Sequence, residues 1–502
     1  MNNETIPNKQ RALVLQGGGA LGAYEAGAFK ALCEKIRKKD EKGRPLFDII
    51  AGTSIGAINA AIIVSEFLKE KNWKSSAEKL ENFWKHVSVP SDIVLERTRW
   101  WHNKNRQSAS REAARRYYCT KKFTYTGVKN VFTSPTMIND DKFFDMEDTV
   151  HEWLPSWITL PNVVKNIWIR YNNEPLKKSL HEFANFPIST SFDNSEPRLL
   201  LVSVDVAEGI AVTFDSYEKE KNDQGNTIRR TEYGGTPSGK PIKIEYNDGI
   251  KLEHVMASAT VPLFYDYQDI EGRKFWDGGL LSNTPLREVI ESHRAYWEYK
   301  LGSENIEGYI KSAGKQNRQK VPDLEVYIVN VWPSKEKVVP TDYDGAKERL
   351  NDIMFSDTTD HDVRIAKVVT QQIDLIEKLI ALGSHDNQWR KKISEILDEI
   401  NPQTNKRNID IIKGQFKIAK VVRIERRDDR HSISSKFSDF TVETINRLTV
   451  KQFWVMAYCI STLLNFKTEI CILKLADEPL LNLIQDLIIE YRTDPDVLVL
   501  AH

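Results

Sequence analysis

The stretch FDIIAGTSIGAINAAIIVSEFLKE, residues 47–70, decides the fold. It begins with the short apolar run 47–52, which is typical of a buried strand and stops at a glycine. The part from residue 54 onward is apolar on nearly all sides, so we expect a buried helix there. A buried strand that turns directly into a buried helix is typical of a parallel sheet covered by helices.

The segment before it has the same order of elements. Residues 11–16, RALVLQ, predict another buried strand, and GGGALGAYEAGAFKALCEKI (17–36) predicts a glycine loop that opens a helix. Two consecutive units of this kind predict an α/β fold with a mostly parallel central sheet.

Further elements are expected at wider spacing along the chain. The patterns predict strands within 198–214, 273–286, 324–333 and 416–427, a short helix within 254–265, and an amphipathic helix over 364–383. Residues 217–248 contain many Gly, Asn, Lys and Thr residues and predict a hairpin or a loop excursion. Beyond about residue 340 we expect mainly helix.

Bulk composition excludes several classes of protein. The chain has 502 residues, and 71 Lys and Arg balance 71 Asp and Glu, so we expect no nucleic acid as partner. The first residues carry no signal-peptide pattern, and no apolar window reaches ~18 residues. The four cysteines are too scattered for a disulfide framework or a zinc pair. We therefore expect a cytoplasmic protein whose membrane contact, if any, is peripheral.

The glycine loop Gly17-Gly18-Gly19 is the first candidate functional motif. Glycines let backbone N–H groups approach a ligand closely, and the following helix N-terminus adds positive potential. The loop therefore suits an anion, either a bound phosphate or the oxyanion of an acyl-transfer intermediate. A dinucleotide site and a purely structural turn remain alternatives for this loop taken alone.

The second motif, GTSIG, places Ser54 between Gly52 and Gly56 at a strand–helix junction. Small flanking residues allow the strained turn of a nucleophile elbow, which lifts a serine hydroxyl above the sheet. A dinucleotide fold instead needs an acidic residue at the end of this strand. The nearest acid, Asp48, lies at the strand start, so the motif favours a nucleophilic serine.

The third motif is Asp277-Gly278-Gly279, directly after the apolar run RKFW. An Asp at the end of a strand, followed by glycines, is a carboxylate held by a turn and open to a cleft. The alternative is an Asp that only caps the turn through its side chain.

Taken in order, GGGALG, GTSIG and DGG resemble the motifs of the patatin-like phospholipases. ASATVP (257–262) and DGGLLSNTPL (277–286) are similar to further family segments, and FSDFTVETINR (437–447) is similar to a bacterial branch with a C-terminal extension. The resemblance covers about 10–335. It implies a patatin-like three-layer sandwich with a mostly parallel central sheet, followed by a mainly helical region over 340–502.

The resemblance also implies a function, lipid acyl hydrolysis by a Ser–Asp dyad without histidine and without metal or cofactor. By this resemblance Ser54 would be the nucleophile and Asp277 the base. The oxyanion donors would lie around Gly17, Gly18 and Gly19. The elbow motif would include Gly52 and Gly56, and the base motif Gly278 and Gly279. Many family members carry Arg or Lys where this chain has Leu21, which leaves the main chain to hold the oxyanion. His254 is expected to be a surface or packing residue.

Three other functions are alternatives for the same motifs. An acyl-CoA-type acyltransferase also uses G-x-S-x-G but needs a His partner, and an idle lipid-binding scaffold would not need all three motifs. A dinucleotide oxidoreductase would need the missing acid. Because an Asp titrates near ~4 and a His near ~6.5, a dyad should keep much of its kcat/KM at mildly acid pH.

An insertion around 90–190 is basic and aromatic. Within residues 91–130, ten Lys and Arg stand against three Asp and Glu; the aromatic residues there are Trp100, Trp101, Tyr117, Tyr118, Phe123 and Tyr125. The segment is expected either to dock on an anionic membrane through Arg111, Arg115 and Arg116 or to form a solvated helical lid. The expected partners are a lipid substrate, a peripheral membrane surface and a second copy of the chain bound through the C-terminal region.

Overall fold

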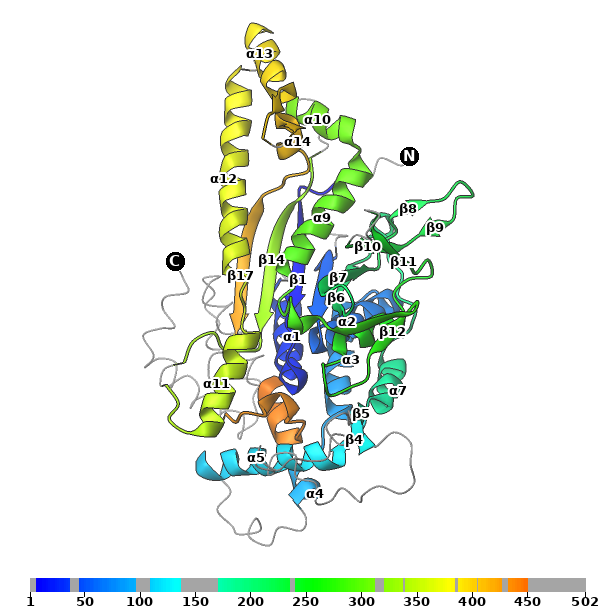
Figure 1. The fold of residues 1–502 in the computed structure, drawn as a ribbon, viewed down its shortest axis with the longest axis vertical. Helices are drawn as coiled ribbons and strands as arrows, with labels where there is room; N and C mark the ends of the chain where they lie inside the picture. Colours follow the sequence, from blue (N-terminus) through cyan, green and yellow to red (C-terminus); the bar gives the residue numbers. More distant parts are fainter. Residues whose placement is uncertain are drawn as a thin grey trace.

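The computed structural model of the chain describes residues 6–36, 45–95, 109–136, 170–234, 240–311, 320–336, 339–383, 387–403, 405–426 and 432–449. Figure 1 shows a central sheet with helices on both of its faces and an elongated tip formed by α12 and α13. This arrangement confirms the predicted α/β sandwich.

The central sheet has eight strands in the order β12-β13-β6-β2-β1-β14-β17, with β7 also paired to β6. The parallel strands are β1 (Lys9–Leu15), β2 (Ile49–Thr53), β6 (Arg198–Asp205), β14 (Asp323–Asn330) and β17 (Ile418–Glu425). The antiparallel additions are β7 (Ile210–Asp215), β12 (Gln268–Ile270) and β13 (Arg273–Asp277). Each predicted strand is thus present, and the sheet is mostly parallel.

Two hydrophobic clusters cover the two faces of the sheet. Alternate residues of a strand point to opposite faces, so Leu13 and Leu15 of β1 join one cluster while Ala12 and Val14 join the other. The first face is covered by α1 (Ala23–Ile36), α2 (Ile55–Glu70), α3 (Trp73–His86), α7 (Glu174–Phe183) and α8 (Leu252–Ala259). The second is covered by α9 (Leu286–Leu301), α10 (Ser303–Lys311) and α12 (Asp360–Gly383).

Helix α2 is buried on nearly all sides, as its composition predicts. Its first three turns are buried at every residue from Ile55 to Ser65. The helix that begins directly after Ser54 is thereby fixed between the sheet and α3.

The C-terminal region is mainly helical but also contributes to the sheet. It contains α11 (Tyr343–Phe355), α12, α13 (Asn387–Asp398) and α14 (Asn408–Ile412), with the short strands β15 (Ile400–Asn401) and β16 (Lys406–Arg407). Strand β17 pairs in parallel with β14 over seven residue pairs. The domain boundary near residue 340 stays a prediction. Strand β17 lies beyond that residue and forms the last strand of the central sheet.

The predicted excursions form small peripheral elements. Residues 217–248 contain two hairpins, β8 (Glu220–Lys221) with β9 (Thr227–Ile228) and β10 (Arg230–Tyr233) with β11 (Ile242–Glu245). The insertion contains α4 (Ser91–Leu95), α5 (Ala109–Thr126) and a sheet of β3 (Gly127–Val128), β4 (Phe132–Thr136) and β5 (Arg170–Asn172). Trp100 and Trp101 lie outside the described residues.

The expected lipid contact through the arginines of α5 is wrong for two of its three residues. Arg116 is fully buried and its Nε donates to Asp439 at 2.7 Å. Arg115 is also buried, with its guanidinium bonded to Glu112 at 2.6 Å and to Thr441 at 2.8 Å. These cations hold α5 to residues 439–444 and cannot reach a membrane. Among the described helices, none is long and apolar enough to span a bilayer.

Candidate active site

Ser54 lies at a strained turn between β2 and α2. Its backbone has φ 57° and ψ −125°, a combination that a non-glycine residue adopts only when its surroundings impose it. The flanking glycines make the turn possible. A Cβ on Gly52 would lie 2.2 Å from the Gly56 carbonyl oxygen, and one on Gly56 would lie 2.4 Å from the Leu15 carbonyl oxygen. This is the geometry of a nucleophile elbow.

Strand β6 brings Ser54 and Asp277 together. Thr53, the last residue of β2, pairs with Val202, and Asp277, the last residue of β13, pairs with the adjacent Ser203. Because β2 runs parallel to β6 and β13 runs antiparallel to it, the two strands end head to head on one edge of β6. The serine and the carboxyl group therefore meet at this point, and the Ser54 side chain is close enough to Asp277 to lower the pKa of its carboxyl group.

Asp277 is a buried carboxyl group with a raised pKa. Burial raises its pKa to about 6, while hydrogen bonds from the Ser54 hydroxyl and the Gly279 N–H oppose this shift. The Gly279 N–H lies 2.7 Å from the carboxyl oxygen, so the Asp277-Gly278-Gly279 turn orients the group. A Cβ on Gly278 would lie 2.3 Å from the Val202 carbonyl oxygen, which excludes larger residues there.

Two further hydroxyl groups hold the elbow, and neither was singled out from the sequence. The Ser54 N–H donates to Ser258 Oγ at 3.1 Å, and Ser258 in turn donates to the Val202 carbonyl at 2.5 Å. Thr53 Oγ1 donates to the Ser282 carbonyl at 2.9 Å. Ser258 lies within the ASATVP segment, so the sequence carried a signal for it.

The glycine loop lies against the elbow, but its first amide is occupied. A Cβ on Gly17 would lie 3.0 Å from the Ser54 Cβ, so this glycine allows the close approach. The Gly17 N–H donates to the Asn283 carbonyl at 3.1 Å, which corrects the expectation that it is an oxyanion donor. Within the described ranges the N–H groups of Gly18 and Gly19 have no such partner. The loop continues into η1 (Gly19–Gly22) and α1, and Leu21 is buried in the core.

The carbonyl side of the same loop is held by residues from later in the chain. Trp332 Nε1 donates to the Gly17 carbonyl at 2.6 Å. Gln16 Oε1 accepts from the Val331 N–H at 2.7 Å, and Gln16 Nε2 donates to the Phe355 carbonyl at 3.0 Å. Asn283 belongs to the DGGLLSNTPL segment, whereas Trp332 and Phe355 have no signal in the sequence.

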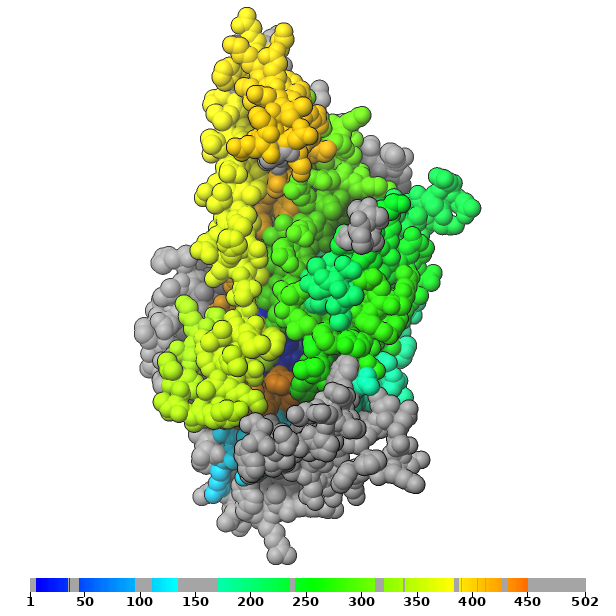
Figure 2. Space-filling model, viewed as in Figure 1, coloured from blue at the N-terminus to red at the C-terminus, as the bar shows by residue number. Residues whose placement is uncertain are grey.

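The C-terminal region covers this loop. The turn η7 (Lys436–Ser438) packs on η1, and a Cβ on Gly19, whose φ is 56°, would lie 2.4 Å from the Phe437 carbonyl oxygen. Lys436 Nζ forms buried contacts with Asp352 at 2.6 Å and Glu348 at 2.9 Å, and lies 5.5 Å from the centre of the Trp332 ring. Figure 2 shows dark blue N-terminal atoms between α11–α12, α9 and the orange C-terminal segment.

The described histidines do not join this site. His254 is buried against Phe214, and its ring Nδ1 accepts the Lys251 N–H at 2.9 Å. Burial, helped by the nearby Lys251 charge, lowers the pKa of His254 to about 3. His254 is thus a packing residue but not a surface residue.

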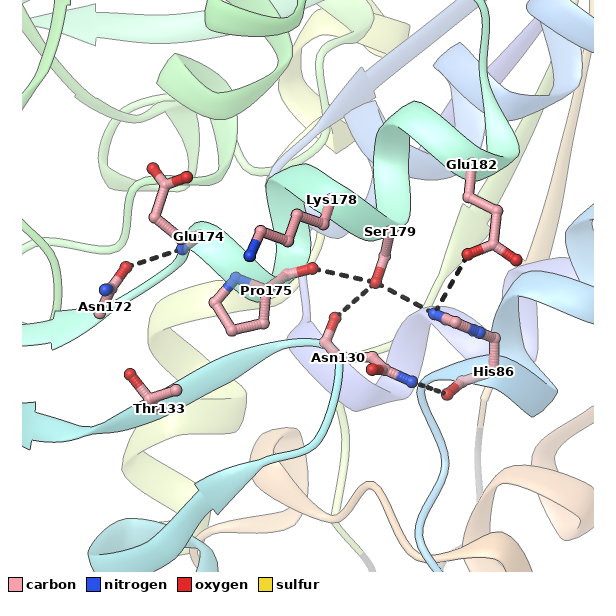
Figure 3. Close-up of a pocket in the computed structure, with 9 residues that line it drawn as sticks. All are labelled: His86, Asn130, Thr133, Asn172, Glu174, Pro175, Lys178, Ser179 and Glu182. Carbon is pink, nitrogen blue, oxygen red and sulfur yellow. Dashed lines mark hydrogen bonds and ion pairs between the residues drawn. The ribbon is translucent and has the colours of Figure 1, made fainter.

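A Ser–His–Glu group elsewhere invites comparison with a catalytic triad. His86, Ser179 and Glu182 line a hollow of about 380 Å³ between α3, β4, β5 and α7 (Figure 3). His86 Nε2 lies 3.2 Å from Ser179 and 3.9 Å from Glu182, so one ring nitrogen faces both partners. A triad needs the two partners on opposite nitrogens. Ser179 also donates to the Asn130 and Pro175 carbonyls, at 2.8 Å and 3.0 Å. The group is therefore a structural hydrogen-bond cluster.

In the part of the chain that the structure describes, no cluster of His, Cys, Asp and Glu has the arrangement of a metal site. What the fold presents is an α/β sheet with a strained serine, a buried carboxyl group and a glycine loop, which defines a protein with a nucleophile elbow. The family model for patatin-like phospholipases matches residues 13–290. This match covers more than half of the chain, so the protein belongs to the patatin-like phospholipase family, as its motifs predict.

Other comparisons add little. The solved structure of VipD from Legionella pneumophila is 10% identical, and the match covers 91% of this chain and 67% of that chain with a TM-score of 0.27. No curated protein matches the chain. Family membership supports lipid acyl hydrolysis as the general activity.

Proposed function

We propose that the protein cleaves fatty-acyl esters of lipids, as a phospholipase A or lysophospholipase does, by a Ser54–Asp277 dyad. The observation that carries the proposal is that Ser54, at a strained elbow, meets the buried Asp277 carboxyl group where β2 and β13 end side by side on β6. A carboxylate in that position is placed to take the serine proton directly.

The reaction divides into two acyl transfers. Asp277 takes the Ser54 proton while Ser54 Oγ attacks the ester carbonyl carbon, and the carbonyl oxygen becomes an oxyanion. The N–H groups of Gly18 and Gly19 are the candidates for stabilising that oxyanion. The alcohol leaves with the proton from Asp277, and the acyl group stays on Ser54. Water then attacks the acyl-enzyme with Asp277 as base, and a fatty acid is released.

The acyl-CoA-type acyltransferase has no support among the described residues. That chemistry needs a histidine beside the serine, and no hydrogen bond joins any of the five described histidines to Ser54 or Asp277. His293, for example, is buried and its Nε2 lies 2.8 Å from the Pro322 carbonyl oxygen. An idle scaffold would have no need for the strain at Ser54.

The test compares two serine variants of the full chain. Ser54→Ala should lower ester hydrolysis roughly a thousand-fold or more and abolish labelling by a fluorophosphonate probe. Ser179→Ala removes the serine that lies beside His86, and this variant should keep both the hydrolysis and the labelling. Mass analysis of phospholipids incubated with the wild type should show free fatty acid. Labelling that persists in Ser54→Ala, or is lost in Ser179→Ala, would show that another residue is the nucleophile.

A further inference from the structure

Two loops beside the Ser54–Asp277 site expose large apolar side chains, which we call the apolar rim. The rim consists of Val261, Leu263, Phe264, Leu280 and Leu281, exposed by 37%, 71%, 42%, 50% and 52%. The first three follow α8, and the last two follow the Asp277-Gly278-Gly279 turn. A group of exposed apolar residues at one place is a mark of an interaction site, whereas scattered ones are ordinary.

Hydrogen bonds hold the two loops of the rim together next to the catalytic carboxyl group. The Asp277 N–H donates to the Thr260 carbonyl at 2.8 Å, and Val261 is the next residue. On the other side of Asp277, the Leu281 N–H donates to the Gly278 carbonyl at 3.1 Å. The Phe264 carbonyl accepts the Tyr171 N–H at 2.8 Å, and the two rings stack with centres 5.7 Å apart. Backbone hydrogen bonds therefore hold both loops of the rim in place beside Asp277.

The rim is also depleted of charge. Residues 255–265 contain no Asp, Glu, Lys, Arg or His, and residues 275–286 contain only the buried Asp277, in a chain that is 28% charged. A surface of this kind avoids the cost of moving charged side chains into a medium of low dielectric constant. It also gains from the transfer of its apolar area out of water.

Leu263 is held in a strained conformation at the most exposed point of the rim. Its φ is 68°, in the left-handed region that a leucine rarely adopts. The positive φ belongs to the turn from Val261 to Phe264, which the Phe264 N–H closes by donating to the Val261 carbonyl at 3.3 Å. This turn holds the Leu263 side chain out at the surface. Strain of this kind is concentrated where the chain performs a function.

We propose that the apolar rim docks the enzyme on the uncharged surface of a lipid aggregate that contains its substrate. The inference rests on the proposed function, because the rim borders the Ser54 site. A protein partner bound at the rim would lie against the catalytic turn and hinder entry of an ester, whereas a lipid aggregate supplies the ester. The absence of cations from the rim selects neutral and zwitterionic headgroups over anionic ones.

The test uses full-length chains and a matched control pair. Leu263→Asn with Leu281→Gln removes apolar surface, and Asn tolerates the left-handed backbone at residue 263. The control, Ile396→Gln with Ile400→Gln, changes residues that are 58% and 57% exposed at the tip near α13 (Figure 1). Each variant is measured for binding to phosphatidylcholine vesicles and for hydrolysis of a short-chain ester dissolved as monomers.

The rim variant should bind vesicles and cleave their lipid roughly ten- to a hundred-fold less well, while monomeric ester is cleaved within about two-fold of wild type. The control should match the wild type on both substrates, and binding should not weaken in high salt. Unchanged vesicle binding in the rim variant, an equal loss in the control, or binding that requires anionic lipid would each overturn the proposal. If the rim variant does not fold, Val261→Thr with Leu280→Gln replaces it.

The two proposals fail in different ways. Vesicle binding is measured with Ser54→Ala as well as wild type, so it does not depend on turnover. A wild type that binds phosphatidylcholine through the rim but cleaves no ester would refute the hydrolase proposal alone. A wild type that cleaves monomeric ester and shows no rim-dependent binding would refute the docking proposal alone.

Discussion

Replacing Asp277 by Asn should make the protein inactive and more stable. Burial raises the pKa of Asp277 from 3.8 to about 6, so at neutral pH the fold holds an ionised carboxylate where water would hold it better. A difference of about 2 pKa units corresponds to about 3 kcal/mol of stability. Asn keeps the shape and an oxygen for the Gly279 N–H but carries no charge, so up to about 3 kcal/mol should be regained.

The gain has a defined dependence on pH. Well below pH 3.8 the wild-type carboxyl is protonated in both the folded and the unfolded chain, so Asn has no electrostatic advantage. As the pH rises from 3.8 through about 6, the unfolded chain releases the proton first and the wild-type fold loses stability relative to the variant. Above that range the difference is constant. Urea unfolding at about pH 4, 5, 6 and 8 measures the free energies of unfolding of both chains.

A stability gain that is absent at the highest pH, or that is the same at every pH, would refute the assignment of Asp277 as a buried ionised group. Activity supplies the second half of the test, because Asp277→Asn should lower kcat/KM by orders of magnitude while circular dichroism stays unchanged. The raised pKa of Asp277 also changes the pH dependence of activity that we predict. With the pKa of Asp277 near 6, kcat/KM should fall below that pH much as it would for a histidine.

Two variants test the support of the glycine loop from later parts of the chain. Trp332→Phe removes the N–H that donates to the Gly17 carbonyl at 2.6 Å. We expect kcat/KM to fall by up to roughly ten-fold while the fold stays intact. Unchanged kinetics would show that the loop holds its shape without this hydrogen bond. Lys436→Met removes the cation that lies 2.6 Å from the buried Asp352 carboxylate. Urea unfolding should show that the free energy of unfolding falls by about 3–5 kcal/mol. A decrease of less than about 1 kcal/mol would contradict the buried ion pair.

The elements of the site that follow local rules could be predicted from the sequence. A serine elbow requires glycines two residues before and after it, and the contacts of Gly52 and Gly56 show why no other residue fits. The strands were predictable for a similar reason, since short apolar runs that end at Gly or Asp have few other structures available. Local pattern, however, does not say which strands are neighbours. That β2 and β13 end head to head on β6 is a property of the sheet order.

The errors come from partners that are distant in the chain. Arg115 and Arg116 lie in a basic aromatic segment whose composition predicts an exposed surface. The partner of Arg116, Asp439, is 323 residues away in the chain. The local sequence likewise predicts a free Gly17 N–H group. In the fold this group donates to the carbonyl of Asn283, which is 266 residues later in the chain. A local pattern reports the charge or donor that a residue carries. It does not report the group that neutralises it.

The glycine loop extends the functional unit beyond the matched family segment. The family model ends at residue 290, yet the contacts that shape the loop come from Trp332, Phe355 and Phe437. An oxyanion site made of main-chain N–H groups has no side chain to adjust, so its geometry depends wholly on what holds its carbonyl side. Because β17 joins the sheet and η7 packs on Gly19, the C-terminal region up to residue 449 lies against the glycine loop of the proposed active site. Its removal should therefore distort the oxyanion loop even where Ser54 and Asp277 are intact.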